Sequence, residues 1–387
     1  MSQITYLLIE FLDELVFGAQ GALMPLLQAD FQLSYIQIGL LLSVPGYVSL
    51  FIEPILGILA DTWQRRRLIL GGGLFFVLAL ALTAISRSFD LLLFSFILFA
   101  PASGAFVSLS QSTWMDEDPD RRDQNMARWT FAGSLGVVLG PLLLGAALAI
   151  GLGWRGLHLV LAALTLAALL FAFRFIRPPL SASHQPGTPF QASSFISGLK
   201  SALATLRRPN VLRYMILLEF ADLMLDILLA FLALYFVDVV GLDPKIAILA
   251  VAVWSVVGLL GDFLLIPLLE KFSGLAYLRI SVVIELILYP AFLLAPGLTA
   301  KLIILGLLGL FNSGWYAILK AELYKAIPGQ SGAMLVLDNI GAIIGKTLPL
   351  GIGILAQAFG LGPAMWVLLA GPVALLIGLP RNLKPAT

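Results

Sequence analysis

The sequence contains no cysteine and only two histidines, His158 and His184. The absence of cysteine excludes a disulfide framework, a thiolate zinc site and catalysis by a thiol, and two imidazoles leave little scope for histidine metal chemistry. Charge is also scarce, because 12% of the residues are charged, whereas a soluble domain of ordinary composition has about 25%. The 23 Lys and Arg residues nearly balance the 22 Asp and Glu residues, so the net charge is +1. This balance excludes the strongly basic surface of a nucleic-acid-binding protein.

Apolar residues are abundant instead, at 60% of the chain. They form twelve stretches long enough to cross a bilayer, for which about 20 residues suffice. We place the stretches at residues 4–28, 36–60, 68–86, 91–114, 127–150, 154–176, 210–237, 246–269, 275–295, 302–321, 332–358 and 362–379. The sequence therefore predicts an all-α integral membrane protein with twelve transmembrane helices, whose function lies among those helices.

Only one connection between the stretches is long, at residues 177–209, and its composition is typical of a linker followed by a basic surface helix. It divides the chain into an N-terminal six-helix bundle (1–176) and a C-terminal six-helix bundle with a short tail (210–387). The first stretch contains Glu10, Asp13 and Glu14 and has no small-residue cleavage site. We therefore expect it to be a retained helix rather than a signal peptide.

The basic residues lie mainly on one side of the predicted membrane helices. If the N-terminus is inside, the inner side holds 18 of them and the outer side holds Arg87, Arg155, Lys245 and Lys301. Positively charged loops remain in the cytoplasm. The distribution predicts a multi-pass protein of the cell's inner (plasma) membrane with both termini in the cytoplasm.

The two halves of the chain repeat one another in sequence. LLIEFLDEL in the first stretch aligns with ILLEFADLM in the seventh at an offset of 209, which pairs Glu10 with Glu219 and Asp13 with Asp222. The same or nearly the same offset pairs Glu53 with Asp262, Asp61 with Glu270, Ser103 and Gly104 with Ser313 and Gly314, and Pro141 with Pro349. Matched carboxylates are not expected from chance alignment of apolar segments, so a duplicated bundle is predicted.

This layout of two six-helix halves joined by a long middle loop resembles the major facilitator superfamily. The segment GILADTWQRRR (57–67) is similar to that family's motif after the second span, with matches at Gly57, Asp61, Arg66 and Arg67 and departures at Thr62 and Gln64. The resemblance implies a fold of two bundles related by pseudo-twofold symmetry. It also implies that these four matching residues, together with Glu270 in the repeat, act in gating, as charged latches that break and re-form. A plain positive-inside stop signal is the alternative.

A second segment, GSLGVVLGPLLLG (133–145), resembles the motif of proton-coupled drug antiporters within the superfamily. The resemblance rests on Gly136, Gly140, Pro141 and Gly145, while Ala127 and Leu144 stand where that pattern has glycine. The resemblance implies an exporter. The alternative is a helix-packing motif alone, because small residues and proline are frequent in membrane helices.

Away from their ends, the predicted spans contain many acidic residues and one base, Lys346. The acids are Glu10, Asp13, Glu14, Glu53, Glu219, Asp222, Asp226, Asp262, Glu285 and Asp338. A charge at the centre of a bilayer costs about 2.5–3.5 kcal/mol even on a lenient scale. Most of these groups must therefore face a wet cavity, pair with a cation or carry a proton, because burial disfavours the charged form of a carboxyl. Each of these states suits a carrier of protons or cations.

Helical spacing places these acids in stripes, with Glu10, Asp13 and Glu14 on one face of the first span and Glu219, Asp222 and Asp226 on one face of the seventh. The family resemblance implies that all except Glu285 lie on helices that line a central cavity. The predicted substrate-binding and proton-coupling residues are Glu10, Asp13, Glu14, Glu53, Asp222, Asp226, Asp262, Asn312, Tyr316, Asp338 and Asn339. In this set, Asn312 and Tyr316 are expected to share a face of the tenth span.

These features predict a secondary transporter that works by alternating access and exports a small cationic or amphipathic organic solute in exchange for protons. We expect a monomer in the lipid bilayer, with no cofactor besides protons as the coupling ion, no metal and no nucleic-acid partner. Export of a divalent metal cation and proton-coupled uptake of a small polar solute remain alternatives. A membrane-embedded receptor or hydrolase is a further alternative, but the sequence contains neither HExxH nor GxSxG, so an enzyme is not expected.

Overall fold

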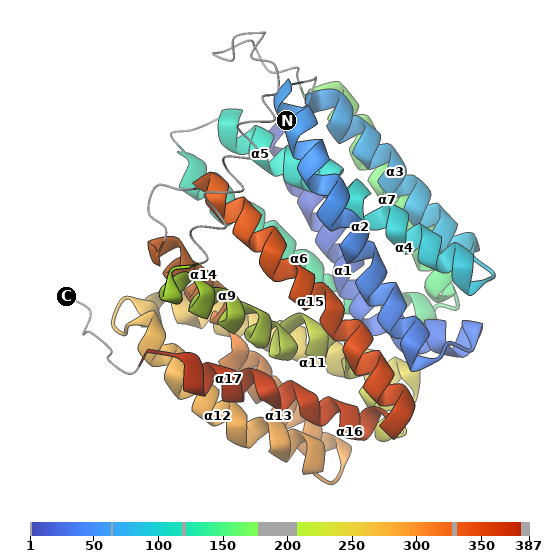
Figure 1. Cartoon of the computed structure of the whole chain (residues 1–387). Helices are drawn as coiled ribbons and strands as arrows, with labels where there is room; N and C mark the ends of the chain where they lie inside the picture. Colours follow the sequence, from blue (N-terminus) through green and yellow to red (C-terminus); the bar gives the residue numbers. More distant parts are fainter. Residues whose placement is uncertain (1, 63–64, 118–120, 177–206, 327–330, 381–387) are drawn as a thin grey trace. The chain divides into compact units, whose positions relative to one another are not determined.

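A computed structural model describes residues 2–62, 65–117, 121–176, 207–326 and 331–380 (Figure 1). The described residues form helices and no strand, which confirms the all-α prediction. Eleven helices are long and apolar enough to cross a membrane, and α1 (Ser2–Phe31), with 30 residues, is the twelfth span. The chain divides into two compact units, Met1–Gln191 and Ala192–Thr387. Most of the predicted linker and surface helix lies outside the described residues.

The N-terminal unit contains the first six spans, coloured blue to green in Figure 1. Its helices are α1, α2 (Tyr35–Thr62), α3 (Arg65–Ile85), α4 (Phe89–Ser103) continued through the π-helical turn η1 (Gly104–Ser108) into α5 (Leu109–Glu117), α6 (Arg122–Ala149) and α7 (Gly153–Phe175). Within this unit α1 packs most extensively on α6, and α3 packs on α4 and α7. The fourth span is thus one apolar segment with a π-helical turn at its middle.

Glycines on α6 allow α1 and α6 to approach closely. A Cβ atom added to Gly136 would lie 2.6 Å from the carbonyl oxygen of Phe11, and one added to Gly140 would lie 2.4 Å from the backbone nitrogen of Ala19. These neighbours are backbone atoms that cannot rotate away, so only glycine fits. Gly136 and Gly140 therefore have a packing role. In the same segment Pro141 is buried and Gly145 is partly buried.

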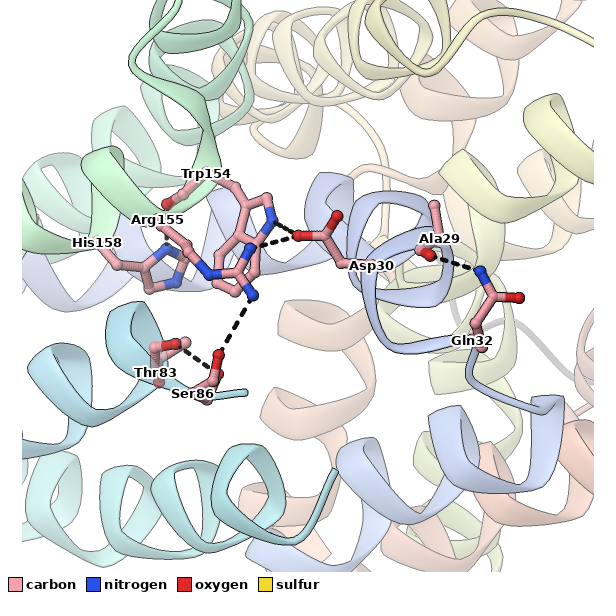
Figure 2. A network of polar contacts seen from close by, with 8 residues as sticks. All are labelled: Ala29, Asp30, Gln32, Thr83, Ser86, Trp154, Arg155 and His158. Atoms are coloured by element: carbon pink, nitrogen blue, oxygen red, sulfur yellow. Dashed lines mark hydrogen bonds and ion pairs between the residues drawn. The ribbon is translucent and has the colours of Figure 1, made fainter. Parts of the chain in front are cut away.

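One end of the N-terminal unit is held together by Asp30, as Figure 2 shows. Its carboxylate accepts hydrogen bonds from Trp154 Nε1 at 2.8 Å and from Arg155 Nη1 at 2.5 Å. Arg155 also donates from Nη2 to the carbonyl oxygen of Ser86 at 3.2 Å, just beyond the end of α3. His158 Nδ1 lies 2.8 Å from the carbonyl oxygen of Trp154. This network joins the ends of α1, α3 and α7.

The C-terminal unit contains the other six spans. The seventh span is formed by α9 (Pro209–Asp222), η3 (Leu223–Ile227), α10 (Leu228–Leu234) and η4 (Tyr235–Val239) in succession. The eighth and ninth spans are α11 (Pro244–Leu269) and α12 (Gly274–Leu294), and the tenth is α13 (Leu298–Asn312) with α14 (Trp315–Ala326). The eleventh span is α15 (Ser331–Phe359), and the twelfth is formed by α16 (Leu361–Met365), η5 (Trp366–Leu369) and α17 (Ala370–Gly378). Two π-helical turns, η3 and η4, interrupt the seventh span. Within this unit α11 and α12 both pack on α13, and α9 packs on α14, α15 and α17.

The tenth span is broken, so the prediction of a continuous helix over 302–321 is wrong. Gly314, between α13 and α14, has a φ of +73°, a conformation that glycine adopts without the steric cost of a side chain. The break changes which residues share a face. Asn312 is 3% exposed whereas Tyr316 is 58% exposed. The face predicted to hold both Asn312 and Tyr316 therefore does not exist.

A buried lysine secures the C-terminal unit near the beginning of α13. Lys301 is 6% exposed, and its Nζ donates to the hydroxyl of Tyr235 at 2.9 Å and to the carbonyl oxygens of Phe292 and Leu293 at 2.7 and 3.1 Å. The two carbonyls belong to the last turn of α12, where a cation is favourable. Lys301 therefore connects α13, the end of α12 and the π-helical turn η4.

Candidate functional site

The three acids of α1 lie on one stripe of the helix but approach two different neighbouring helices. A Cβ atom added to Gly133 of α6 would lie 2.6 Å from Glu10 Oε1, and one added to Gly136 would lie 2.9 Å from Glu14 Cβ. Asp13, in contrast, accepts a hydrogen bond at 2.8 Å from the hydroxyl of Ser103, the last residue of α4. The structure therefore places Glu10 and Glu14 against the glycines of α6, and Asp13 against the middle of the fourth span.

The second span brings another carboxylate to the same part of the fourth span. A Cβ atom added to Gly104 would lie 2.9 Å from Oε1 of Glu53 on α2. Gly104 is the first residue of the π-helical turn η1, and such turns are frequent at functional sites. Adjacent residues, Ser103 and Gly104, therefore contact the carboxylates of Asp13 and Glu53 from α1 and α2.

The C-terminal unit repeats the contact between an acid of the first helix and a glycine of the fifth. Cβ atoms added to Gly341 and Gly345 of α15 would lie 2.8 and 2.6 Å from the two carboxylate oxygens of Glu219 on α9. Asp222 lies near the same segment, with Oδ2 4.0 Å from the Cβ position of Gly345. The sequence alignment of Glu10 with Glu219 thus corresponds to equivalent helix contacts in the two units.

Asp222 and Asp226 lie where α9 passes into the π-helical turn η3. Asp222 is partly buried, and Asp226 is exposed on the surface of the unit. The charge of Lys346 on α15 acts on both carboxylates. The single base that the sequence places within a span is therefore in electrostatic reach of two of the predicted acids.

Asp262 of α11 contacts the break in the tenth span. Its Oδ1 accepts a hydrogen bond of 3.1 Å from the backbone N–H of Gly314. The neighbouring Ser313 donates its hydroxyl to the carbonyl oxygens of Gly258 and Gly309 at 3.0 and 3.1 Å. Asp262 therefore contacts Gly314 in the tenth span, and Glu53 contacts Gly104 in the fourth span of the other unit.

Asn312 connects the broken span to the seventh. Its Nδ2 donates a hydrogen bond of 3.0 Å to the carbonyl oxygen of Met224 in η3. Its Oδ1 is buried and has no hydrogen-bond partner among the described residues, and the same holds for Nε1 of Trp254 on α11. Buried polar atoms are normally paired. These two atoms are therefore candidates for contact with a bound solute.

Sequence reasoning did not assign Ser103, Gly104, Gly133 or Gly314 to the site. The internal repeat contained the signal for three of them, because it aligned Ser103 and Gly104 with Ser313 and Gly314. Small residues in a membrane helix are too common to be noticed without such an alignment. Gly133 differs, because its only signal is its place in the glycine-rich segment.

Among the predicted gating residues, Arg66 forms contacts within its own unit. Arg66 donates to the carbonyl oxygens of Ile176 and Phe173 at 2.8 and 2.6 Å, so it binds the C-terminal end of α7. The neighbouring Arg65 forms an ion pair with Asp116 at 2.7 Å. Arg67 is exposed. These contacts join the beginning of α3 to the ends of α5 and α7.

The structure gives few or no contacts for the remaining predicted residues. A Cβ atom added to Gly57 would meet nothing within 4 Å, so packing does not require glycine there. Glu270 is the exposed residue that ends α11. Lys320 lies with its Nζ 5.7 Å from the ring centre of Tyr316. The side chains of Asp61, Asp338 and Asn339 lie outside those that the structure describes.

Comparison with known proteins decides the family. The family model described as Major Facilitator Superfamily matches residues 6–346. The chain belongs to the Major Facilitator Superfamily. This membership confirms the family resemblance of the second-span motif and the twelve-span layout. The protein is therefore a multi-pass membrane carrier of small molecules and not an enzyme.

Solved structures support the same fold. A bacterial homologue of the human lysosomal transporter Spinster, in an inward-facing and unoccupied conformation, matches this superfamily member with a TM-score of 0.75 and 20% identity over 98% of this chain and 94% of that one. The nucleoside transporter NupG matches with a TM-score of 0.76 and 14% identity over 98% of each chain. At these identities the likeness shows the major facilitator fold and not the substrate.

The candidate site consists mainly of carboxylates. In the described residues no group of three or more His, Cys, Asp and Glu side chains is arranged to hold a metal ion. Asp13, Glu53 and Asp262 each contact a residue at the middle of the fourth or tenth span. In a carrier, such groups can bind a cation or a proton and can change the helix contact when they do so.

Proposed function

We propose that this carrier is a proton-coupled exporter of a small cationic or amphipathic organic solute and that it works by alternating access. One observation carries the proposal: in each unit, an acid of the second span contacts the middle of the fourth or tenth span. These contacts are Glu53 against Gly104 and Asp262 against Gly314. Intramembrane carboxylates are costly, so their presence at equivalent places supports a role in moving protons or cations.

The chemistry of the site favours a cation as the solute. Asp13, Glu53, Asp222, Asp226 and Asp262 supply the negative charge in the two units, and Lys346 is the base close to two of them. Asn312 Oδ1 offers a buried acceptor, and Trp254 presents an indole that can also contact a cation through its ring. Within the C-terminal unit, Asn312, Trp254 and the nearby acids would suit an ammonium group that carries an apolar body.

Coupling follows from competition for the same oxygen atoms. An ionised carboxylate attracts the cation, whereas the protonated acid has lost that attraction. A proton and a cation that exclude each other at Asp13 or Asp222 exchange across the membrane as the carrier alternates between its two openings. The antiporter-like segment with Gly136, Gly140, Pro141 and Gly145 supports the outward direction of solute movement.

The setting of the transporter forms part of the same proposal. The excess of Lys and Arg on one side of the spans supports cytoplasmic termini in the inner membrane. A monomer in the lipid bilayer is part of the proposal. Gly57, Asp61, Arg67 and Glu270 remain proposed gating residues, and Arg66 would contribute through its contact with the end of α7.

Proton release on binding tests the proposal without a membrane. The purified protein in weakly buffered detergent solution is mixed with a panel of organic cations, and the pH change is recorded. We expect release with at least one cation, and we expect Asp13→Asn and Asp222→Asn to reduce it. Asp90→Asn, at an exposed position in the first turn of α4, is the matched control and retains full release.

The outcomes separate the proposed function from its alternatives. No release across the panel, with both aspartate variants still transporting solute in proteoliposomes, would remove the export proposal. Release caused only by divalent metals would favour the metal exporter. Accumulation of a sugar or another polar solute inside proteoliposomes, driven by a proton gradient, would favour uptake. No solute movement under any condition would favour a receptor or hydrolase.

A further inference from the structure

Glu285 is a carboxyl buried in the C-terminal unit, on a helix that the sequence gives no functional weight. It lies on α12 and is 0% exposed. Neither of its oxygen atoms has a hydrogen-bond partner among the described residues. Intramembrane acids are expensive, and buried polar groups without partners are rare. A structural role alone gives no reason for a carboxyl at this position.

The hydroxyl groups one helical turn from Glu285 on α12 already donate their protons in other hydrogen bonds. Ser281 donates its hydroxyl to the carbonyl oxygen of Leu278 at 3.0 Å. Tyr289 donates its hydroxyl to the carbonyl oxygen of Met365 at 2.7 Å. Each hydroxyl has a single proton but can still accept a hydrogen bond. Either hydroxyl oxygen could therefore accept a hydrogen bond from a protonated carboxyl, but neither has a free proton to donate to an ionised Glu285.

The bases on the elements around Glu285 are engaged elsewhere. Helix α12 packs on α13, α14, η5 and α17, and neither η5 nor α17 contains a titratable side chain. On α13 Lys301 binds Tyr235 and the end of α12, and on α12 Arg279 donates to the carbonyl oxygen of Pro380. The titratable residues on α14 are Tyr316, Lys320, Glu322, Tyr324 and Lys325. The ammonium group of Lys320 lies over the ring of Tyr316, and Lys325 forms an ion pair of 2.6 Å with Glu322.

A line of contacts joins this region to Asp262. The indole Nε1 of Trp315 donates to Ser281 Oγ at 2.9 Å. Trp315 directly follows Gly314, whose backbone N–H binds Asp262 at 3.1 Å. A movement at the break of the tenth span therefore reaches Ser281, one helical turn from Glu285.

We propose that Glu285 is a proton-binding site inside the C-terminal unit, in which the carboxylic acid holds its proton in this conformation and releases it when the break at Gly314 moves. An ionised carboxylate with no donor and no cation is strongly disfavoured in an apolar interior. Release transfers the proton to water admitted beside Ser281 and leaves the carboxylate. As a coupling site Glu285 rests on the proposed proton coupling, but its protonation in this conformation does not.

Infrared spectroscopy of the full chain in lipid vesicles tests the site with protons as the only ligand and no solute added. The carbonyl stretch of a protonated carboxylic acid lies apart from the amide bands. The wild-type spectrum minus that of Glu285→Gln at neutral pH is expected to contain this band, with a shift in D2O. Glu322→Gln, on α14, is the matched control and is expected to leave the band in place because Glu322 is paired with Lys325.

A second variant keeps the proposal testable if Glu285→Gln fails to fold. Ser281→Ala retains the carboxyl but removes a hydroxyl one helical turn away, and we expect the carbonyl band of Glu285 to shift. We also expect the wild-type band to decrease when a proton gradient drives the carrier through its cycle. A variant that lacks the band should show no such decrease.

Two results would overturn the proposal. If neither Glu285→Gln nor Ser281→Ala changes the carbonyl region, Glu285 does not hold a proton. If the band is present but is unchanged by alkaline buffer and by an imposed proton gradient, the acid is only structural. Failure of the cation-release experiment leaves the static band unaffected. Success of that experiment without the band would place coupling on the other carboxylates.

Discussion

The carboxylate of Asp262 accepts a hydrogen bond of 3.1 Å from the backbone N–H of Gly314, the residue at which the tenth span breaks. The N-terminal unit has a related contact, because Glu53 lies against Gly104 at the start of a π-helical turn. Each contact joins an acidic side chain to an irregular part of a helix. In the proposed mechanism, a proton or cation bound at Asp262 would weaken this hydrogen bond and so link binding to helix conformation.

Variants of Asp262 separate the hydrogen bond from the charge. Asp262→Ala removes the acceptor for Gly314 at the start of α14, and losing such a helix cap costs about 0.5–2 kcal/mol. Asp262→Asn retains an acceptor oxygen and loses only the charge. We expect the alanine variant to lower the thermal unfolding midpoint in detergent, and the asparagine variant to keep the midpoint but lose proton release. Equal midpoints for both variants would show that the hydrogen bond does not stabilise the break.

Replacing a tightly packed glycine of α6 by alanine should lower stability, whereas replacing a glycine with open space around it should not. Gly140→Ala places a Cβ atom 2.4 Å from the backbone nitrogen of Ala19, so α1 and α6 must separate. Overpacking of this kind costs about 1–3 kcal/mol. Gly71→Ala in α3 is the matched control, because its Cβ atom meets nothing within 4 Å. That control is expected to stabilise the helix by up to about 1 kcal/mol.

Thermal unfolding followed by tryptophan fluorescence measures both glycine variants. The expected order of midpoints is Gly71→Ala at or above wild type, and Gly140→Ala clearly below it. A Gly140→Ala variant as stable as wild type would contradict the close backbone approach between α1 and α6.

Lys301 is expected to stabilise the C-terminal unit although it lies in an apolar region. Lys301→Met keeps most of the volume but removes the donor to Tyr235, Phe292 and Leu293. Hydrogen bonds from a charged group contribute about 1.5–3 kcal/mol, and we expect a loss of stability of this size. Lys245→Met, at an exposed position on α11, is the control and should have no effect. Similar midpoints for the two variants would argue against the buried position of Lys301.

Two adjacent arginines of the second-span motif should have different effects on stability. Arg66 donates to the carbonyl oxygens of Phe173 and Ile176 at the end of α7, whereas Arg67 is exposed. A cation at a helix C-terminus contributes up to about 2 kcal/mol in a partly buried setting. Arg66→Ala should therefore lower the unfolding midpoint, and Arg67→Ala should leave it unchanged. If Arg67→Ala is the more damaging variant, the assignment of the two contacts is wrong.

The span positions were predictable because each depends on a local run of apolar residues. The first span was expected at 4–28 and α1 extends over Ser2–Phe31, and the eighth was expected at 246–269 and α11 extends over Pro244–Leu269. The break in the tenth span was missed because apolar residues continue on both sides of it. The segment Asn312-Ser313-Gly314 held the only local signal, and such residues also occur within unbroken membrane helices.

The candidate site was predictable in its residue types but not in its contacts. Spacing along α1 placed Glu10, Asp13 and Glu14 on one stripe, yet Asp13 reaches Ser103 while Glu10 lies against Gly133. A stripe on a helix is wide enough to face two neighbours, and the rotation of the helix decides which acid meets which. Glu285 was set aside on the expected position of its helix, and only its burial without a hydrogen-bond partner in the described part of the chain distinguishes it.

The sequence by itself determined that the chain crosses the membrane, that its halves are related and that acidic side chains enter the spans. Insertion of a helix depends on the hydrophobicity of that segment alone, and duplication leaves aligned residues along the chain. Only the tertiary structure decided that Asp262 binds a broken helix, that Arg66 caps α7 and that Glu285 is buried with no hydrogen-bond partner among the described residues. Those contacts join residues far apart in sequence, and they depend on how closely the glycines let the helices approach.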